Sequence, residues 1–263
     1  MDAGATAHAD VTDAVRAADV VVTMLPNADV TATVMLDDAA VDAMKPDAIW
    51  VQMATIGVTV TEQLAARISD RRPDVTYVDA PVSGSRGPAE SGDLLILASG
   101  PAFAASKLER VFSVLGRKTM WLGTAGAGSR MKLILNTWLA FQTEGAAESA
   151  SLAEVLGVEA GSLLEALEGN ALASPYALAK LAKMLERDFR PDFSIDLALK
   201  DLELVRDEAG PAAAPVATAI AQRWRQLVEH DSSGLDVSAA GRDLGRSGVA
   251  AAAADTSREA ATR

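Results

Sequence analysis

The chain has 263 residues and a net charge of −12, with 49% apolar and 23% charged side chains. An acidic chain is repelled by phosphates, so we expect no general nucleic-acid partner. No apolar run approaches the ~20 residues of a membrane helix, and no membrane partner is expected. There is no cysteine, and the histidines are His8 and His230. This excludes disulfides and thiolate zinc sites, argues against any metal site, and favours a cytoplasmic location.

Five short apolar runs in the first half predict strands. They lack polar alternation, which is typical of strands buried on both faces of a parallel sheet. Helical patterns separate them, at residues 60–70 and 102–115, and this alternation predicts βαβ units and a mostly parallel sheet. The five runs are Asp19–Pro26, Ile49–Met53, Val75–Asp79, Leu94–Ala98 and Lys118–Leu122.

The second half is predicted to be helical, with no strand after Leu122. Helical periodicity covers residues 132–156, 160–168, 174–186, 195–208 and 215–229. The glycine-rich stretch 123–128 marks the boundary. The predicted fold class is therefore α/β. An incomplete Rossmann-like parallel sheet domain at 1–123 precedes an all-helical domain at 124–246, and the alanine-rich tail 247–263 is expected to be frayed or disordered.

Residues 79–87, Asp-Ala-Pro-Val-Ser-Gly-Ser-Arg-Gly, directly follow a predicted strand. Ligands of open α/β sheets bind outside the carboxyl ends of strands. Serine hydroxyls and closely approaching backbone N–H groups could hold an anion there. An ordinary turn rich in Gly, Pro and Ser is an equally good interpretation.

Residues 126–136 place Lys132 and Asn136 four positions apart, on one face of a predicted helix. A lysine near a helix start is disfavoured by the helix dipole, and burial would lower its pKa further. Such a lysine could act as a general acid or base. A solvated surface lysine is the commoner outcome. Likewise, the pair Lys200-Asp201 is more often solvated than part of a ligand site.

Taken in order, these segments resemble the β-hydroxyacid dehydrogenases, over about residues 4–239. Strand 19–26 ends in a Leu-Pro loop, and residues 53–56, Met-Ala-Thr-Ile, are similar to the family's Met-Ser-Thr-Ile turn. Residues 79–84 are similar to its substrate loop. The spacing from Gly126 to Asn136 is similar to its catalytic segment, and residues 193–202 to its late cofactor-closing helix.

The resemblance implies a role for nine residues and an NAD or NADP cofactor. Lys132 would be the catalytic acid/base at the substrate oxygen. Ser83, Gly84 and Ser85 would bind the carboxylate of a small β-hydroxyacid of the 3-hydroxyisobutyrate type, and Asn136 would orient it. Leu25, Pro26 and Thr55 would line the cofactor, and Lys200 would contact it. A homodimer or higher homo-oligomer through the helical domain is also implied.

The sequence departs from the family pattern at several positions. Leu135 and Ser85 replace a common asparagine and glycine, and Val30 stands where a cofactor-contacting asparagine is usual. The opening strand with its Gly-x-Gly-x-x-Gly turn has no counterpart here. That turn supplies pyrophosphate donors, so we expect this chain to bind a nicotinamide dinucleotide weakly. We also expect an open edge on strand 19–26.

Two alternatives remain. An imine reductase has a related architecture but generally lacks the lysine. A non-catalytic dimerisation or binding protein would be consistent with the missing glycine turn.

Overall fold

A computed structural model describes residues 4–242, so the expected frayed tail at 247–263 lies outside the described residues. The chain divides into two compact units, which meet between Leu135 and Asn136. Among the described residues, none of the helices combines the length and apolarity that crossing a bilayer requires.

The first unit contains a parallel sheet in the order β1-β2-β3. Its strands are β1 (Val20–Thr23), β2 (Ile49–Gln52) and β3 (Thr76–Asp79). They pair in register, with Val20 opposite Ile49 and Ile49 opposite Thr76. Every residue of β2 is buried, which explains its unbroken apolar run. β1 is the edge strand, as expected, and Val22 on it is exposed.

A second sheet has the order β4-β5-β6. It consists of β4 (Val82–Ser83), β5 (Leu94–Ala98) and β6 (Gly116–Trp121). β5 and β6 are parallel, but β4 runs antiparallel to β5. Paired backbone hydrogen bonds between Asp79 and Ser99 join the two sheets. The predicted parallel pairing is confirmed for β1–β3 and for β5 with β6. The antiparallel strand β4 was not predicted, because a strand of two residues carries no detectable period.

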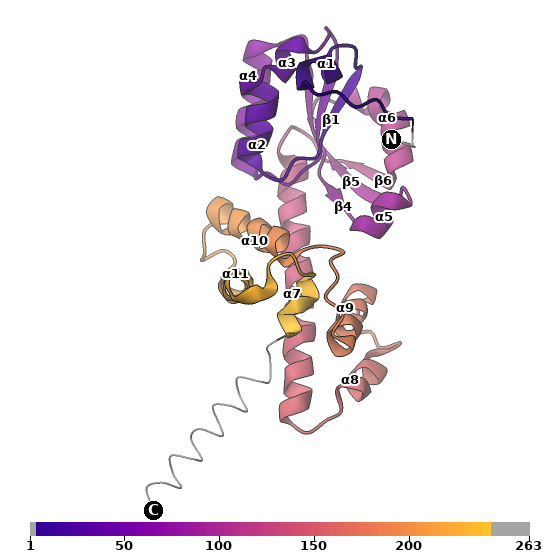
Figure 1. Cartoon of the computed structure of the whole chain (residues 1–263), viewed down its shortest axis with the longest axis vertical. Coiled ribbons are helices and arrows are strands. Elements are labelled where there is room, and N and C mark those ends of the chain that lie inside the picture. Colours follow the sequence, from indigo (N-terminus) through magenta and orange to yellow (C-terminus); the bar gives the residue numbers. More distant parts are fainter. Residues whose placement is uncertain (1–3, 243–263) are drawn as a thin grey trace, which may run out of the picture. The chain divides into compact units, whose positions relative to one another are not determined.

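Helices cover both faces of these strands (Figure 1). α4 (Val58–Arg71) packs Leu64 and Ile68 against one apolar cluster, and α6 (Ala104–Leu115) packs Leu108 and Phe112 against another. Four short helices and a π-helical turn complete the unit, and the sequence patterns did not reveal them. They are α1 (Val11–Val15), α2 (Ala28–Ala32), the turn Thr33–Asp37, α3 (Ala40–Ala43) and α5 (Arg86–Glu90).

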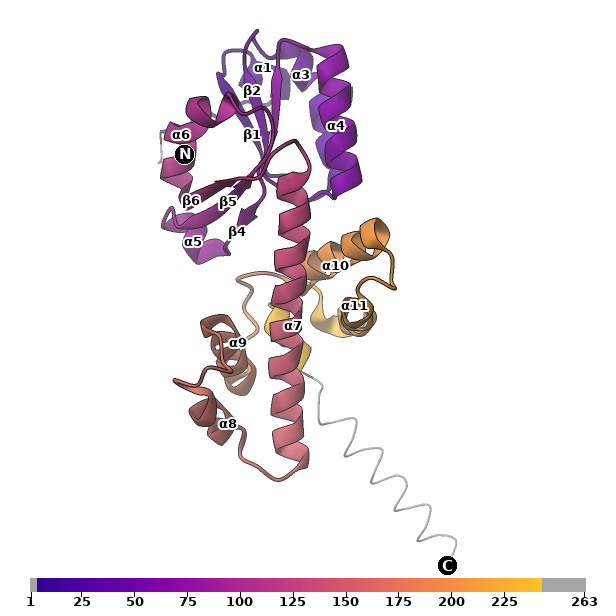
Figure 2. The ribbon, with the colours of Figure 1, turned by 180° about the vertical axis from the view of Figure 1, so that it is seen from behind.

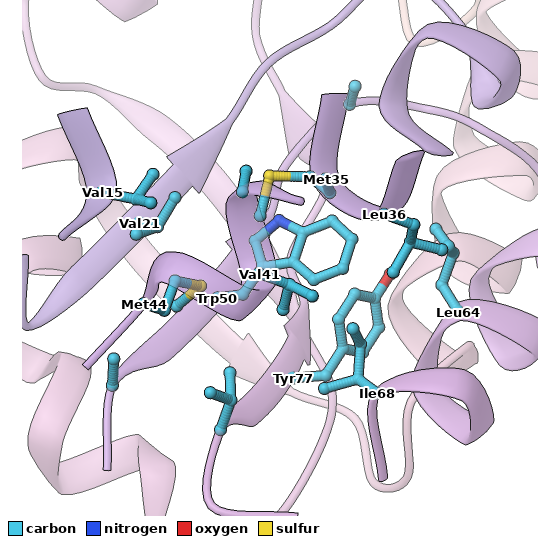
Figure 3. Close-up of a cluster of buried hydrophobic side chains, with 14 of the residues drawn as sticks. Val15, Val21, Met35, Leu36, Val41, Met44, Trp50, Leu64, Ile68 and Tyr77 are labelled. Carbon is cyan, nitrogen blue, oxygen red and sulfur yellow. The ribbon is translucent and has the colours of Figure 1, made fainter. Parts of the chain in front are cut away.

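Trp50 and Tyr77 form the centre of the first cluster, with their rings edge to face at a centroid distance of 5.0 Å (Figure 3). Such a pair contributes about 0.5–1.5 kcal/mol beyond the area it buries. The buried Trp50 indole N–H donates to Thr23 Oγ1 at 2.9 Å, which ties β2 to β1. The cluster therefore fixes the strands whose carboxyl ends carry the candidate cofactor residues.

α7 (Ala127–Val155) is a single long helix that belongs to both units. It begins at Ala127 rather than at the predicted Lys132. Gly123 and Gly126 have positive φ angles of 112° and 96°, so the glycine-rich stretch forms the turn before the helix. Lys132 consequently lies in the second turn of α7, where the helix dipole acts more weakly than we expected.

The second unit is helical, and no strand follows β6 among the described residues. Figure 2 shows α8 and α9 on one side of α7 and α10 and α11 on the other. Buried Glu144 of α7 accepts hydrogen bonds from Arg223 at 2.7 Å and from the Trp224 indole at 2.8 Å. The bounds are α8 (Ala160–Leu167), α9 (Pro175–Glu186), α10 (Ile195–Ala209), α11 (Pro215–Leu227) and a 3-10 helix (Val237–Gly241).

Candidate functional site

Three of the predicted cofactor residues lie at one edge of the first sheet. Leu25 and Pro26 directly follow β1, and Thr55 follows β2. These strands are parallel neighbours, so their carboxyl ends meet at the same edge. Gln52 shapes the turn before Thr55, because its side chain bonds Ala54 N at 2.9 Å and Ala54 O at 2.6 Å. The edge of the sheet thus brings Leu25, Pro26 and Thr55 together.

The predicted substrate loop begins in β4. Ser83 pairs with Leu95 of β5, and Ser85 directly precedes α5. Gly84 between them has φ of +135°, and a Cβ there would lie 2.7 Å from Leu94 Cδ2. Glycine is therefore required at this position, and it exposes backbone between the two serines. Ser83 belongs to a strand of two residues rather than to a loop, and the choice between an anion site and an ordinary turn stays a prediction.

Buried Asp79, the last residue of β3, is a residue to which we assigned no role from the sequence. Its carboxylate accepts hydrogen bonds from Ser129 N at 2.9 Å, Ser129 Oγ at 2.8 Å, Ser99 Oγ at 3.0 Å and Gly126 N at 3.2 Å. Burial raises the pKa of the Asp79 carboxyl, although these bonds act in the opposite direction. The sequence contains one signal that could have pointed to Asp79, namely an acidic residue at the end of an apolar strand.

Lys132 is half-buried and lies one turn after Ser129 on α7. Its position follows from the contacts at the start of that helix, where Asp79 holds Gly126 and Ser129. The same carboxylate belongs to the strand that leads into Ser83, Gly84 and Ser85. The first unit therefore connects the predicted acid/base residue and the predicted carboxylate loop through one buried side chain.

Asn136 and Lys200, which are far apart in the sequence, meet at one carboxylate in the second unit. Asn136 Nδ2 donates to Asp201 Oδ2, and Lys200 Nζ lies 2.9 Å from Asp201 Oδ1. Asp201 is buried, so the interpretation of Lys200-Asp201 as a solvated pair is wrong for the aspartate. The reason is that α10 turns Asp201 toward its neighbours within this unit, and the sequence alone does not fix that direction.

Comparison with known proteins supports the assignment of the fold and the family. Residues 1–123 match the NAD binding domain of 6-phosphogluconate dehydrogenase, and residues 126–244 match the NAD-binding region of NADP-dependent 3-hydroxyisobutyrate dehydrogenase. The 3-sulfolactaldehyde reductase of Escherichia coli is 30% identical over 225 residues, which cover 85% of this chain and 75% of that protein.

Comparison with a solved structure indicates the same family. The 3-hydroxyisobutyrate dehydrogenase of Mycobacterium tuberculosis with L-serine has a TM-score of 0.79 and 29% identity, covering 89% of this chain and 81% of that one. The fold and the two family matches define an oxidoreductase that uses NAD or NADP. The chain belongs to the β-hydroxyacid dehydrogenase family and is an NAD(P)-dependent hydroxyacid dehydrogenase.

The imine reductase alternative receives support at the level of fold alone. An imine reductase from Pseudomonas sp. has a TM-score of 0.53 and 21% identity to this chain. The family matches above favour the hydroxyacid side instead.

Proposed function

We propose that the chain catalyses reversible hydride transfer between the nicotinamide cofactor and a small β-hydroxyacid of the 3-hydroxyisobutyrate type, with Lys132 as the acid/base. The observation that carries this proposal is the position of Lys132 on α7, at a helix start held by Asp79, the residue that leads into the Ser83–Ser85 segment. The solved relative named for 3-hydroxyisobutyrate supports the substrate type.

The oxidation needs one proton acceptor and one anion site. In the oxidation, the neutral amine of Lys132 takes the proton of the substrate hydroxyl while the carbon that bears this hydroxyl becomes a carbonyl carbon. In the reverse direction, the ammonium form of Lys132 returns the proton to the oxygen. Ser83, Ser85 and the backbone of Gly84 bind the carboxylate through charge-assisted hydrogen bonds. Asn136 orients the substrate, and its contact with Asp201 fixes the amide.

The residues at the sheet edge fit one half of a nicotinamide dinucleotide. Parallel strands β1 and β2 place Leu25, Pro26 and Thr55 where ligands of such sheets bind. We propose that these residues line the cofactor and that Lys200 contacts it. The cofactor supplies the hydride acceptor, and the chain supplies binding, orientation and proton transfer.

Replacement of Lys132 tests the proposal. The chain is assayed with NAD⁺ and NADP⁺ against 3-hydroxyisobutyrate and other short β-hydroxyacids. Lys132→Met should lower kcat by ~10²–10⁴-fold, the usual loss for a general acid/base. Lys118→Met, an exposed lysine on β6, is the matched control and should keep wild-type activity. If Lys132→Met keeps kcat within a factor of about two, the acid/base assignment is wrong.

We further propose that the chain self-associates through its helical unit. The proposal is supported by large apolar side chains that are exposed in this unit, most of them at or just after the carboxyl end of α7. They are Leu152, Val155, Leu156, Val158 and Leu172.

A further inference from the structure

One buried carboxylate joins the two halves of the site in the first unit. Asp79 Oδ2 accepts from the backbone N–H groups of Gly126 and Ser129 and from Ser99 Oγ, and Asp79 Oδ1 accepts from Ser129 Oγ. Asp79 is fully buried. Its carboxylate therefore meets hydroxyl and backbone donors and has no direct access to a substrate.

The donors of Asp79 lie at the start of α7. Gly126 immediately precedes the helix, and Ser129 is in its first turn. The first N–H groups of a helix have no partner within the helix, and a carboxylate placed there satisfies them and complements the dipole. A cap normally comes from the residue just before the helix. Here it comes from β3, so it fixes the helix start against the sheet.

Neighbouring contacts make this attachment rigid. Gly128 N donates to Ser99 Oγ at 3.0 Å, and Ser99 Oγ in turn bonds Asp79 Oδ2. Ser129 Oγ also lies 3.2 Å from Thr61 Oγ1 on α4. A Cβ on Gly128 would lie 2.1 Å from the carbonyl oxygen of Leu97. The first turn of α7 therefore packs directly against β5, with no space for a side chain at Gly128.

We propose that Asp79 is a positioning residue for Lys132. The carboxylate sets where α7 begins relative to β3 and β4, and so sets the lysine amine relative to the Ser83–Ser85 segment. This inference rests on the proposed function, since it assigns Asp79 a role that acts through Lys132. Asp79 does not touch substrate or cofactor in this role.

The test is a double-mutant cycle between Asp79→Asn and Lys132→Met. Asparagine keeps the shape but offers one acceptor oxygen, so the start of α7 should shift. A displacement of about 1 Å can cost ~10²-fold in rate. Asp79→Asn alone should therefore lower kcat by ~10–100-fold while the KM for the cofactor stays unchanged. In the Lys132→Met background, Asp79→Asn should lower kcat no further, because the two residues act as a unit.

A purely structural role would give a different pattern. Loss of folded protein lowers kcat by the same factor in both backgrounds, and equal factors would overturn the proposal. Asp70→Asn, an exposed carboxylate on α4, is the matched control and should leave kcat unchanged. If Lys132→Met itself retains activity, the proposed function fails, which is distinguishable from equal factors in the cycle.

A second pair of variants keeps the inference testable if Asp79→Asn does not fold. Ser99→Ala and Ser129→Ala each remove one donor to Asp79 and leave its charge and its other bonds in place. Each serine variant should lower kcat by a smaller factor than Asp79→Asn does. The decrease should occur in the wild-type background and be absent in the Lys132→Met background. Wild-type kcat in both serine variants would overturn the proposal.

Discussion

Ser83 is half-buried at the end of β4. The next residue, Gly84, has no room for a side chain because Leu94 lies too close. We expect Ser83→Ala to weaken carboxylate binding, because a charge-assisted hydrogen bond contributes about 1.5–3 kcal/mol. kcat/KM for a β-hydroxyacid should fall accordingly. The measurement compares the acid with its neutral amide. Equal losses for both substrates would show that Ser83 does not bind the carboxylate.

Asp236 and Lys180 form a buried ion pair inside the helical unit. Asp236 accepts from Lys180 Nζ at 2.8 and 3.0 Å, and from the N–H groups of Asp192 and Ser238 at 3.0 Å. Burial raises the pKa of the Asp236 carboxyl, but these bonds outweigh it and the pKa is lowered overall. A carboxyl with a lower pKa in the folded state stabilises the fold above its unfolded pKa of about 3.9.

The stability of the chain should therefore fall as the pH drops below about 4, since protonation of Asp236 breaks the pair. The measurement is the free energy of unfolding between neutral and acidic pH for wild type and Asp236→Asn. Their difference should shrink on acidification. The exposed variant Asp207→Asn is the control. A difference that is constant with pH would contradict the assignment.

Removal of the cation from the same pair gives an independent expectation. Lys180→Met removes the cation that donates directly to the buried Asp236 carboxylate and leaves Lys183 Nζ 3.8 Å from its Oδ2. The change should cost up to about 3–5 kcal/mol of unfolding free energy at neutral pH. Denaturant unfolding monitored by circular dichroism measures this. A cost below about 1 kcal/mol, typical of exposed pairs, would show that the pair is solvated in solution.

At the scale of elements, the contact between α7 and β5 depends on glycine. A Cβ at Gly128 would approach the Leu97 carbonyl oxygen to 2.1 Å, so Gly128→Ala must push the helix off the strand. Overpacking of this kind costs about 1–3 kcal/mol. Gly145, also within α7, has nothing within 4 Å of such a Cβ. Gly145→Ala should instead stabilise the helix, by up to ~1 kcal/mol.

Urea unfolding of the two variants distinguishes a local packing effect from a general effect of alanine in α7. Opposite signs are expected, together with a lower kcat for Gly128→Ala only. Equal stability changes in the two variants would contradict the close contact between α7 and β5.

The same elements show how far the sequence predicts this structure. The strands β1, β2, β3, β5 and β6 are confirmed with small shifts at their ends, because buried parallel strands are marked by apolar runs. β4 and α5 are too short for a period. The roles of Lys132, Asn136 and Lys200 come from the family resemblance and stay predictions. Asp79 and Asp201 were assigned no role, since only the fold shows which donors face a buried carboxylate.

At the scale of the whole molecule, the domain boundary at 123/124 also stays a prediction. The compact units meet at 135/136, inside α7, whereas the two family matches meet between residues 123 and 126. The difference arises because α7 is continuous. Its first turns are bonded to the sheet through Asp79, and Ala140 and Ala147 pack into the helical core. The helix α7 thus contributes residues to both units.

We expect self-association because several large apolar side chains of the helical unit are exposed, most of them at or just after the carboxyl end of α7. Leu172 is 85% exposed and Leu156 73% exposed. Grouped exposed apolar residues mark interaction surfaces more often than isolated ones do. A symmetric pair of chains would bury them against each other, and a dimer is the commonest such assembly.

Sedimentation or light scattering of the chain should therefore give a mass above that of one chain. The double variant Leu156→Glu with Leu172→Glu should lower that mass, because charges at the centre of an interface are strongly disfavoured. Val114→Glu is the matched control, since Val114 is 72% exposed but lies on α6 in the first unit. A monomeric wild-type chain, or equal effects of the control and the double variant, would show that this surface does not join copies of the chain.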